Sequence, residues 1–278
     1  MKEHLRRLVS GAPGDLARAL LAREYLQARV LEFLQEAGVF LHWAFLGGTA
    51  LRFLFEIPRF SEDLDFSLIK PSDDPAFGRA LGEVERGFAL EGYRVEVKSS
   101  GERAVASAWL AFPGLPLELG FSTRQSQTLS IRLEVDTNPP AGAVVATSLI
   151  RRHVTLNLCH YDRPSLLAGK LHAVLTRPWT KGRDLFDLAW YLADPSWPGP
   201  NFALLNAALA QTGWEGPPLD PSNWIPVLRS RLASLDWKQA REDVSPFLER
   251  PRDLALVSPE SIDNLLSSRE RRGKTSNK

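Results

Sequence analysis

The segment that most constrains the fold is LGGTALRFLFEIPRFSEDLDF, which occupies residues 46–66. Gly47 and Gly48 allow a tight turn without Cβ atoms, and the apolar run that follows is typical of a short helix ended by a proline. Side chains alternate between the two faces of a strand, so Asp63 and Asp65 share one face and their apolar neighbours take the other. The segment therefore predicts a strand, a helix and a second strand that bring a glycine turn close to two carboxylates.

Two neighbouring carboxylates on one strand face indicate a cation. With Cα atoms roughly 6–7 Å apart they repel each other unless a positive charge lies between them. Mg²⁺ is usually held by one or two carboxylates together with substrate phosphates, and the N-terminus of a helix that begins near Thr49 favours phosphate. The pattern indicates a Mg²⁺ (or Mn²⁺) site beside a triphosphate-binding turn. The alternatives are a solvated strand face paired with arginine, and a glycine pair that only makes a turn.

A third acid is expected on a neighbouring strand. The segment SIRLEVDT places Glu134 and Asp136 on one face, while the apolar residues between them take the other. Either carboxylate could complete a two-metal site and accept the proton of an attacking hydroxyl. Ordinary polar residues on a half-buried strand are the alternative interpretation.

Lys170 lies at the edge of the apolar stripe of a predicted helix and is expected to be partly buried. A lysine in that position needs an anionic partner, either a carboxylate or a nucleotide phosphate, because an unpaired buried ammonium group is unfavourable. Asp184 and Asp187, three residues apart on the next helix, are candidates. They could instead complement the positive N-terminus of their own helix.

Composition adds a few limits. The chain has 278 residues, 44% of them hydrophobic, a formal net charge of +1 and one cysteine, Cys159, so an internal disulfide is excluded. No apolar run is long enough for a membrane span, and we expect a cytoplasmic protein with no membrane partner. Between residues 151 and 183 nearly every charge is positive. Such a stretch could bind an RNA backbone or could be a solvated helix face.

The order of predicted elements indicates an α+β fold, with a mixed sheet flanked by helices and followed by a helical C-terminal domain. Helical and strand patterns are mixed in the first half of the chain, helical patterns dominate from Pro164 onward, and the boundary is expected near residues 142–160. We therefore predict three parts: a first domain with N-terminal helices over residues 1–150, a mostly helical domain over 151–266, and a disordered basic tail over 267–278.

Four segments in order resemble the AbiEii/AbiGii-type toxin nucleotidyltransferases, a branch of the DNA polymerase β-like nucleotidyltransferase superfamily. They are GGTAL, RFSEDLDF, IRLEVDTNPP and KLHAVLTRPWTKGRDLFDL, which together extend over residues 46–192. The resemblance implies that residues 1–150 form a nucleotidyltransferase domain.

The resemblance also assigns roles. The family carries an R-x-S-x-D lead-in motif, which corresponds here to Arg59, Ser61 and Asp63. The nucleotide would be bound by the glycine turn and this motif, through Gly47, Gly48, Thr49, Arg59 and Ser61. The metal ligands would be Asp63, Asp65 and Glu134, with Asp136 as the fallback for the third acid. Lys170 would hold a phosphate. Asp184 would be the acid of the family's Arg-Asp (RD) element, with Asp187 supporting it. Beside this site, the basic stretch offers Arg151, Arg152, Arg163, Lys181 and Arg183 to RNA.

The function that follows is a Mg²⁺-dependent nucleotidyltransferase toxin of a toxin–antitoxin system. It would transfer a nucleoside monophosphate from an NTP to an acceptor hydroxyl, with tRNA as the first expected acceptor and an antitoxin protein as a further partner. Pyrophosphate would leave. Two alternatives stay open: transfer to a protein or small-molecule hydroxyl, and a catalytically silent protein that binds nucleotide.

Overall fold

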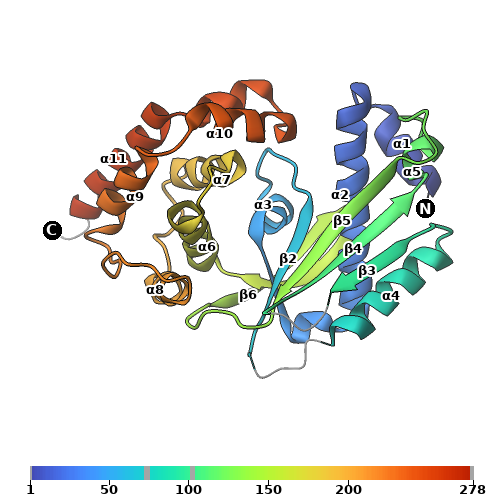
Figure 1. Cartoon of the computed structure of the whole chain (residues 1–278), viewed down its shortest axis with the longest axis horizontal. Helices are drawn as coiled ribbons and strands as arrows, with labels where there is room; N and C mark the ends of the chain where they lie inside the picture. The colour runs from blue at the N-terminus through green and yellow to red at the C-terminus, as the bar shows by residue number, and fades with distance from the viewer. Residues whose placement is uncertain (1, 72–75, 101–103, 276–278) are drawn as a thin grey trace. The chain divides into compact units, whose positions relative to one another are not determined.

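The computed structural model describes residues 2–71, 76–100 and 104–275, the last three without their side chains. The chain forms two compact units (Figure 1). The sheet unit comprises residues 1–56, 60–139 and 145–160, and the helical unit comprises residues 57–59, 140–144 and 161–278. The predicted class, an α+β fold with a mixed sheet followed by a helical part, is confirmed.

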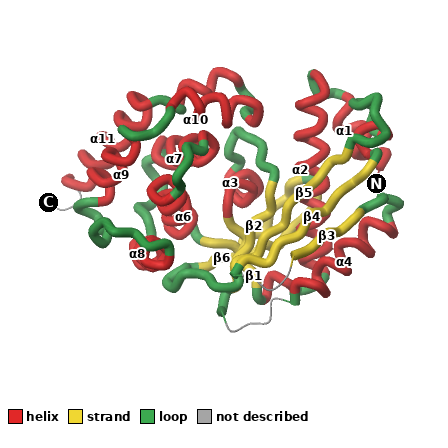
Figure 2. The backbone as a smooth tube through the Cα atoms, in the orientation of Figure 1, coloured by secondary structure: helices red, strands yellow, loops and turns green. Residues whose placement is uncertain are grey.

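The sheet unit is built on a seven-stranded mixed sheet with strand order β3-β4-β5-β2-β1-β7-β6. The strands are β1 (Trp43–Leu46), β2 (Asp63–Leu68), β3 (Glu96–Ser100), β4 (Val105–Pro113), β5 (Thr128–Asp136), β6 (Val145–Arg152) and β7 (Val154–Tyr161). Strand β2 pairs antiparallel with β1 and parallel with β5, whereas β4 pairs antiparallel with both β3 and β5. Figure 2 shows the strands side by side.

Helices surround this sheet. They are α1 (Lys2–Ser10), α2 (Gly14–Glu36), the 3-10 turn η1 (Val39–Leu41), α3 (Gly47–Phe55), α4 (Phe77–Leu90) and the short α5 (Leu115–Glu118). Edge-to-face aromatic contacts hold α2 and α4 against the sheet: the ring centroid of Phe88 on α4 lies 5.1 Å from that of Phe33 on α2 and 4.9 Å from that of Phe112 on β4. Every second side chain of these strands packs into this core, and the side chains between them project from the opposite face of the sheet.

The helical unit contains α6 (Arg163–Thr176), α7 (Gly182–Ala193), α8 (Phe202–Gln211), α9 (Trp224–Leu232), α10 (Trp237–Val244) and α11 (Pro259–Thr275), with 3-10 turns η2 (Ser245–Phe247) and η3 (Pro251–Leu256). Side chains cap several of these helices: the Asp162 carboxylate accepts from the backbone N–H of Ser165, as expected of an N-cap residue. Searched over the described residues, none of the helices has the length and hydropathy needed to cross a membrane.

The first unit differs from the predicted range of residues 1–150, because β6 and β7 continue the sheet and the unit runs to residue 160. The sequence VATSLIRRHVTLNLCHY alternates in the manner of two strands. The turn between them was not predicted because it contains neither glycine nor proline. His153 makes that turn in the left-handed region, with φ of 61°.

The predicted disordered tail is corrected for residues 267–275, which form the end of α11. The Arg269 guanidinium donates to four backbone carbonyls of the α7 end and the loop after it, those of Tyr191, Leu192, Asp194 and Trp197. Arg229 of α9 also binds Glu270 and Ser267. These bonds hold a strongly polar segment as helix. Residues 276–278 lie outside the described part of the chain.

Candidate active site

Three acids predicted as metal ligands lie on one face of two neighbouring strands. In the parallel pairing of β2 with β5, Asp65 lies directly beside Glu134, and Asp63 lies beside Arg132. Paired residues of adjacent strands point to the same face, so Asp63, Asp65 and Glu134 share the face opposite α2 and α4. Their burial is intermediate. We call these three residues the acid row.

The register also separates the two candidates for the third acid. Asp136 pairs with Ser67, one step beyond the two aspartates of β2. Its Oδ1 atom accepts a hydrogen bond from the backbone N–H of Asn138 at 2.9 Å, which closes a local turn after β5. Burial raises the pKa of Asp136. The strand pairing therefore brings Glu134, rather than Asp136, beside Asp65.

The glycine turn lies against the acid row. Gly47 opens α3 with φ of 79°, in the left-handed region, and a Cβ atom there would overlap the Asp65 carboxylate. Both the conformation and the space require glycine. The Thr49 side chain is buried and donates to the backbone carbonyl of Asp63, so it fastens the first turn of α3 to β2. The backbone N–H groups at the start of α3 could therefore donate hydrogen bonds to a ligand at this turn.

Arg132 is the neighbour of the acid row along β5. Its Nη2 atom lies 2.8 Å from Oε1 of Glu134, and its guanidinium lies 5.7 Å from the ring centroid of Trp109 on β4. Within the described residues, no three His, Cys, Asp or Glu side chains are gathered closely enough to hold a metal ion on their own. The donor chemistry still suits Mg²⁺, which needs only one or two carboxylates when substrate phosphates supply the other oxygens.

In the helical unit, Lys170 of α6 is bonded to two carboxylates of α7. Its Nζ atom lies 3.0 Å from Oδ1 of Asp184 and 2.7 Å from Oδ2 of Asp187. Burial would lower the pKa of Lys170, but the two aspartates outweigh it and raise that pKa. Burial would likewise raise the pKa of Asp184, but Lys170 and Arg177 lower it to about 2. The carboxylate partners anticipated from the sequence are thus the ones present.

Arg59 joins the same buried network. Its side chain is 2% exposed, and its Nε and Nη2 atoms each lie 2.5 Å from one oxygen of Asp187, a bidentate arrangement. The lead-in motif is divided between the units, because Arg59 belongs to the helical unit and Ser61 to the sheet unit. The Ser61 carbonyl accepts from the Gln27 side chain at 3.1 Å. This geometry favours a structural role for Arg59.

The five basic residues predicted to bind RNA differ in exposure. Arg151 on β6 and Arg163 at the start of α6 are exposed. Arg152 is bonded to Glu24 at 3.0 Å, and Arg183 lies 3.7 Å from Asp243. Burial lowers the pKa of Lys181; Asp184 opposes this shift, and the neighbouring cations add to it. The basic stretch is therefore partly used in internal pairs.

Sequence reasoning missed Glu24, the centre of a buried network in the sheet unit. Its carboxylate binds Arg52 at 2.6 Å, Arg152 at 3.0 Å and His153 at 2.9 Å. Burial opposes ionisation, but the His153 hydrogen bond and the two arginines outweigh it and lower the pKa of Glu24 to about 2. The available signal was its spacing, because Glu24 lies four residues after Leu20 and four before Ala28 on the buried side of α2.

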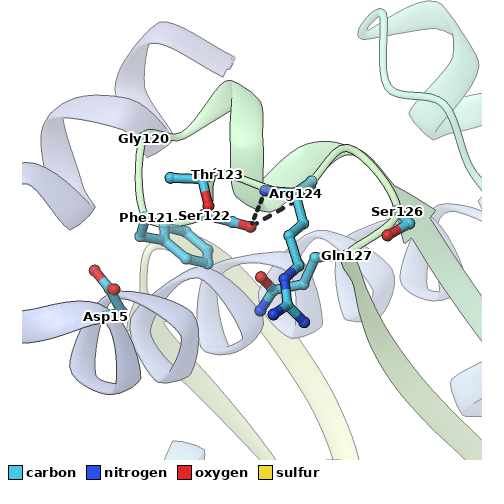
Figure 3. Close-up of a pocket in the computed structure, with 8 residues that line it drawn as sticks. All are labelled: Asp15, Gly120, Phe121, Ser122, Thr123, Arg124, Ser126 and Gln127. Atoms are coloured by element: carbon cyan, nitrogen blue, oxygen red, sulfur yellow. Dashed lines mark hydrogen bonds between the residues drawn. The ribbon is translucent and has the colours of Figure 1, made fainter.

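A separate cavity of about 550 Å³ lies in the sheet unit (Figure 3). It is lined by Asp15 of α2 and by residues 120–124, 126 and 127, which precede β5. The Ser122 hydroxyl there accepts from the backbone N–H of Arg124 at 3.0 Å. Since Glu134 lies near the other end of β5, this cavity is distinct from the acid row.

A mixed sheet with in-register acids and a glycine turn at a helix N-terminus is the arrangement expected of a nucleotidyltransferase. The family described as "Nucleotidyl transferase AbiEii toxin, Type IV TA system" matches residues 29–267. The chain belongs to this family, whose members are toxin nucleotidyltransferases of type IV toxin–antitoxin systems. NTP substrates, a divalent metal and an antitoxin are general properties of the family.

The solved structure of JHP933 agrees with the fold. The chain is similar to JHP933 from Helicobacter pylori, with a TM-score of 0.54, 16% identity and coverage of 93% of this chain and 96% of that one. It is also similar to MenT4, a nucleotidyltransferase toxin from Mycobacterium tuberculosis, with a TM-score of 0.47, 18% identity and coverage of 96% and 98%. No curated protein matches the sequence.

Proposed function

We propose that the chain uses Mg²⁺ or Mn²⁺ to transfer a nucleoside monophosphate from an NTP to an RNA hydroxyl, with tRNA as the acceptor. The observation that carries the proposal is the acid row: Asp65 beside Glu134, with Asp63 on the same face and Gly47 packed against Asp65. Half-buried carboxylates in register on adjacent strands are unfavourable unless a cation compensates them. The donor set and the glycine turn are chemically suited to a hard metal and a triphosphate.

Each part of the site has a distinct task in this proposal. Asp63 and Asp65 would hold the metal, which when bound neutralises charge on the phosphates. The backbone N–H groups at Gly47 and Gly48 would bind the triphosphate, since α3 lacks a side-chain N-cap within the described residues. Thr49 acts through its bond to the Asp63 carbonyl, which sets the distance between the turn and the acids.

The reaction is an in-line displacement at the α-phosphorus. The acceptor oxygen forms a bond to that phosphorus, the bond to the bridging oxygen breaks, and pyrophosphate leaves with the electron pair. Glu134 accepts the proton of the acceptor hydroxyl. The Arg132 guanidinium, 2.8 Å from Oε1 of Glu134, would fix the position of this carboxylate beside Asp65. Glu134 would also serve as a metal ligand.

Lys170 and Asp184 remain proposed contributors. An ammonium group has three donors, and Asp184 and Asp187 use two of them. We propose the third as a phosphate donor, with Asp184 fixing the direction of the Lys170 side chain. Arg59 would act by holding Asp187 rather than by contacting nucleotide.

Exposed Arg151 and Arg163 support an RNA acceptor, because both could pair with backbone phosphates. A protein or small-molecule hydroxyl is the second candidate acceptor. The internal pairing of Arg152 and Arg183 favours it, since those two cations are already used.

The test is incubation of the purified chain with total tRNA, Mg²⁺ and each α-³²P-labelled NTP in turn, resolved on a denaturing gel. We expect label on tRNA from one NTP and none from the Asp63→Ala/Asp65→Ala variant. Asp15→Ala, which removes an exposed carboxylate of α2, is the matched control and should label normally. Transfer that persists in the double variant would refute the proposed site, and label on added protein or alcohol instead of tRNA would identify the second acceptor class.

A further inference from the structure

Three residues beside the acid row form a line across three strands. Lys98 of β3 pairs with Trp109 of β4, and Trp109 pairs with Arg132 of β5, which in turn pairs with Asp63 of β2. Residues paired in this way project from the same face, so all four side chains share the face of the acid row. We call Lys98, Trp109 and Arg132 the stacking row.

Core packing does not explain Trp109. Its neighbours on β4, Ala108 and Leu110, are buried on the opposite face, whereas Trp109 is 48% exposed. The Arg132 guanidinium lies over its ring at 5.7 Å, and the Arg132 side chain is itself 40% exposed. Lys98 on the other side is exposed as well. The Trp109 ring is thus partly exposed to solvent and lies between two cationic side chains.

The geometry of the transfer reaction indicates which reactant the stacking row would contact. In an in-line displacement the attacking hydroxyl approaches opposite the leaving pyrophosphate. The triphosphate turn at Gly47 follows β1, which lies on one side of β2, while β5 and β4 lie on the other side. We therefore place the acceptor on the side of β5 and β4, where Ser107 pairs with Glu134 and Trp109 with the adjacent Arg132.

We propose that the stacking row binds the acceptor as a single-stranded RNA end. A base of the acceptor stacks on Trp109, and Lys98 and Arg132 pair with its phosphates. An aromatic platform flanked by cations is the usual means of binding single-stranded nucleic acid without reading its sequence. Arg132 also connects this platform to Glu134, the proposed proton acceptor, through their 2.8 Å ion pair. The inference rests on the proposed function and specifies how its acceptor is held.

The test is direct binding of a 5′-fluorescein-labelled single-stranded RNA 12-mer to the full-length chain, measured by fluorescence anisotropy in EDTA. Working without metal keeps the result independent of nucleotidyl transfer. Trp109→Ala should weaken binding at least about fivefold, because one stacked base is lost, and Trp109→Phe should retain most of the affinity. Lys98→Gln should flatten the salt dependence by about one phosphate contact.

Two comparison variants make the outcome decisive. The first is Trp179→Ala. The Trp179 ring of the helical unit is 59% exposed and its centroid lies 5.6 Å from the Arg177 guanidinium, so it is a second aromatic ring beside a cation. Leu90→Ala removes an exposed side chain of α4 and should bind RNA normally. Circular dichroism verifies that each variant folds. The proposal is overturned if Trp109→Ala binds RNA as tightly as the unaltered chain, if Trp179→Ala carries the loss instead, or if no RNA binding is detected.

A kinetic measurement distinguishes the acceptor proposal from the proposed transfer reaction on which it rests. For Trp109→Ala, KM for tRNA should rise while KM for the NTP is unchanged. If the Asp63→Ala/Asp65→Ala variant still transfers label, the proposed function fails, although the RNA-binding measurement keeps its meaning. If the double variant is inactive and Trp109→Ala leaves KM for tRNA unchanged, the acceptor proposal alone fails.

Discussion

The two units use aspartate pairs in opposite ways. In the helical unit, Asp184 and Asp187 are buried and bonded to cations: Lys170 binds both, and Arg59 binds Asp187 through two nitrogens. In the sheet unit, Asp63 and Asp65 are only partly buried on a strand face. Spacing in the sequence, three residues on a helix against two on a strand, puts each pair on one side of its element.

This difference in burial and in cationic partners indicates which aspartate pair could bind a metal. Buried carboxylates that protein cations already neutralise gain little from a further cation, and removing one would leave cations uncompensated. Carboxylates that share a face at the edge of solvent can exchange water for a metal and phosphates. We therefore propose a role in stability for Asp187 and in metal binding for Asp63 and Asp65, and the predictions below test that division.

The largest effect is expected for Asp187→Asn. The substitution leaves the buried cations Arg59 and Lys170 short of one negative charge, so the free energy of unfolding should fall by about 3–5 kcal/mol. Urea denaturation followed by circular dichroism measures it. Asp63→Asn is the matched control, and its unfolding free energy should stay within about 0.5 kcal/mol or rise, because repulsion with Asp65 is relieved. Equal losses in both variants would contradict the division.

Glu24 provides a second buried carboxylate, this time in the sheet unit, and a pH test. Its pKa is about 2 in the folded chain against an ordinary value of 4.5. A depressed folded pKa stabilises the fold above the unfolded pKa, and that stabilisation, roughly 3 kcal/mol, is lost as pH falls from about 4.5 toward 2.

The measurement compares unfolding free energies of the unaltered chain and Glu24→Gln at several pH values. The difference between them should be constant above about pH 5.5 and shrink steadily below pH 4.5. A difference that does not change with pH would mean that the charge of Glu24 is unimportant.

Gly47→Ala should affect both stability and transfer. The left-handed conformation costs about 1–2 kcal/mol for alanine, and the new Cβ displaces the Asp65 carboxylate. We expect transfer to tRNA to fall at least about tenfold, since a displacement of even 1 Å at a reacting centre can cost 100-fold. Gly82→Ala on α4 meets no neighbouring atom and should be neutral or stabilising. Normal transfer by Gly47→Ala would exclude the turn from the site.

The smallest effect on folding is expected for Arg151→Glu. The side chain is exposed on β6, so unfolding free energy should change by less than about 0.5 kcal/mol. The adjacent Arg152→Glu should be far more destabilising, because it places a second carboxylate beside Glu24. Thermal unfolding of the two variants side by side distinguishes an exposed cation from a structural one.

Much of this arrangement follows from sequence periodicity. The two-residue spacing of Asp63 and Asp65, and the alternation through Glu134, predicted shared strand faces, and the register confirms that Asp65 and Glu134 are neighbours. The placement of Lys170 between Asp184 and Asp187 follows from helical spacing and the unfavourable burial of an unpaired ammonium group.

Other features depend on tertiary contacts that leave no local pattern. The pairing of Arg59 with Asp187 joins residues 128 positions apart, so the lead-in motif alone did not indicate a structural role. The β6–β7 hairpin turns at His153 without glycine or proline, and the polar end of α11 is held by Arg269. The exposure of Trp109 could not be read from an alternating strand, because both of its faces carry apolar residues.

The most direct test of the central claim is Mn²⁺ binding, measured by electron paramagnetic resonance with a non-hydrolysable NTP present. We compare the unaltered chain with Asp63→Asn/Asp65→Asn and with Asp184→Asn. The account predicts that bound Mn²⁺ disappears in the first variant and persists in the second. Retention of Mn²⁺ by Asp63→Asn/Asp65→Asn, or its loss only in Asp184→Asn, would contradict the assignment of the metal to the acid row.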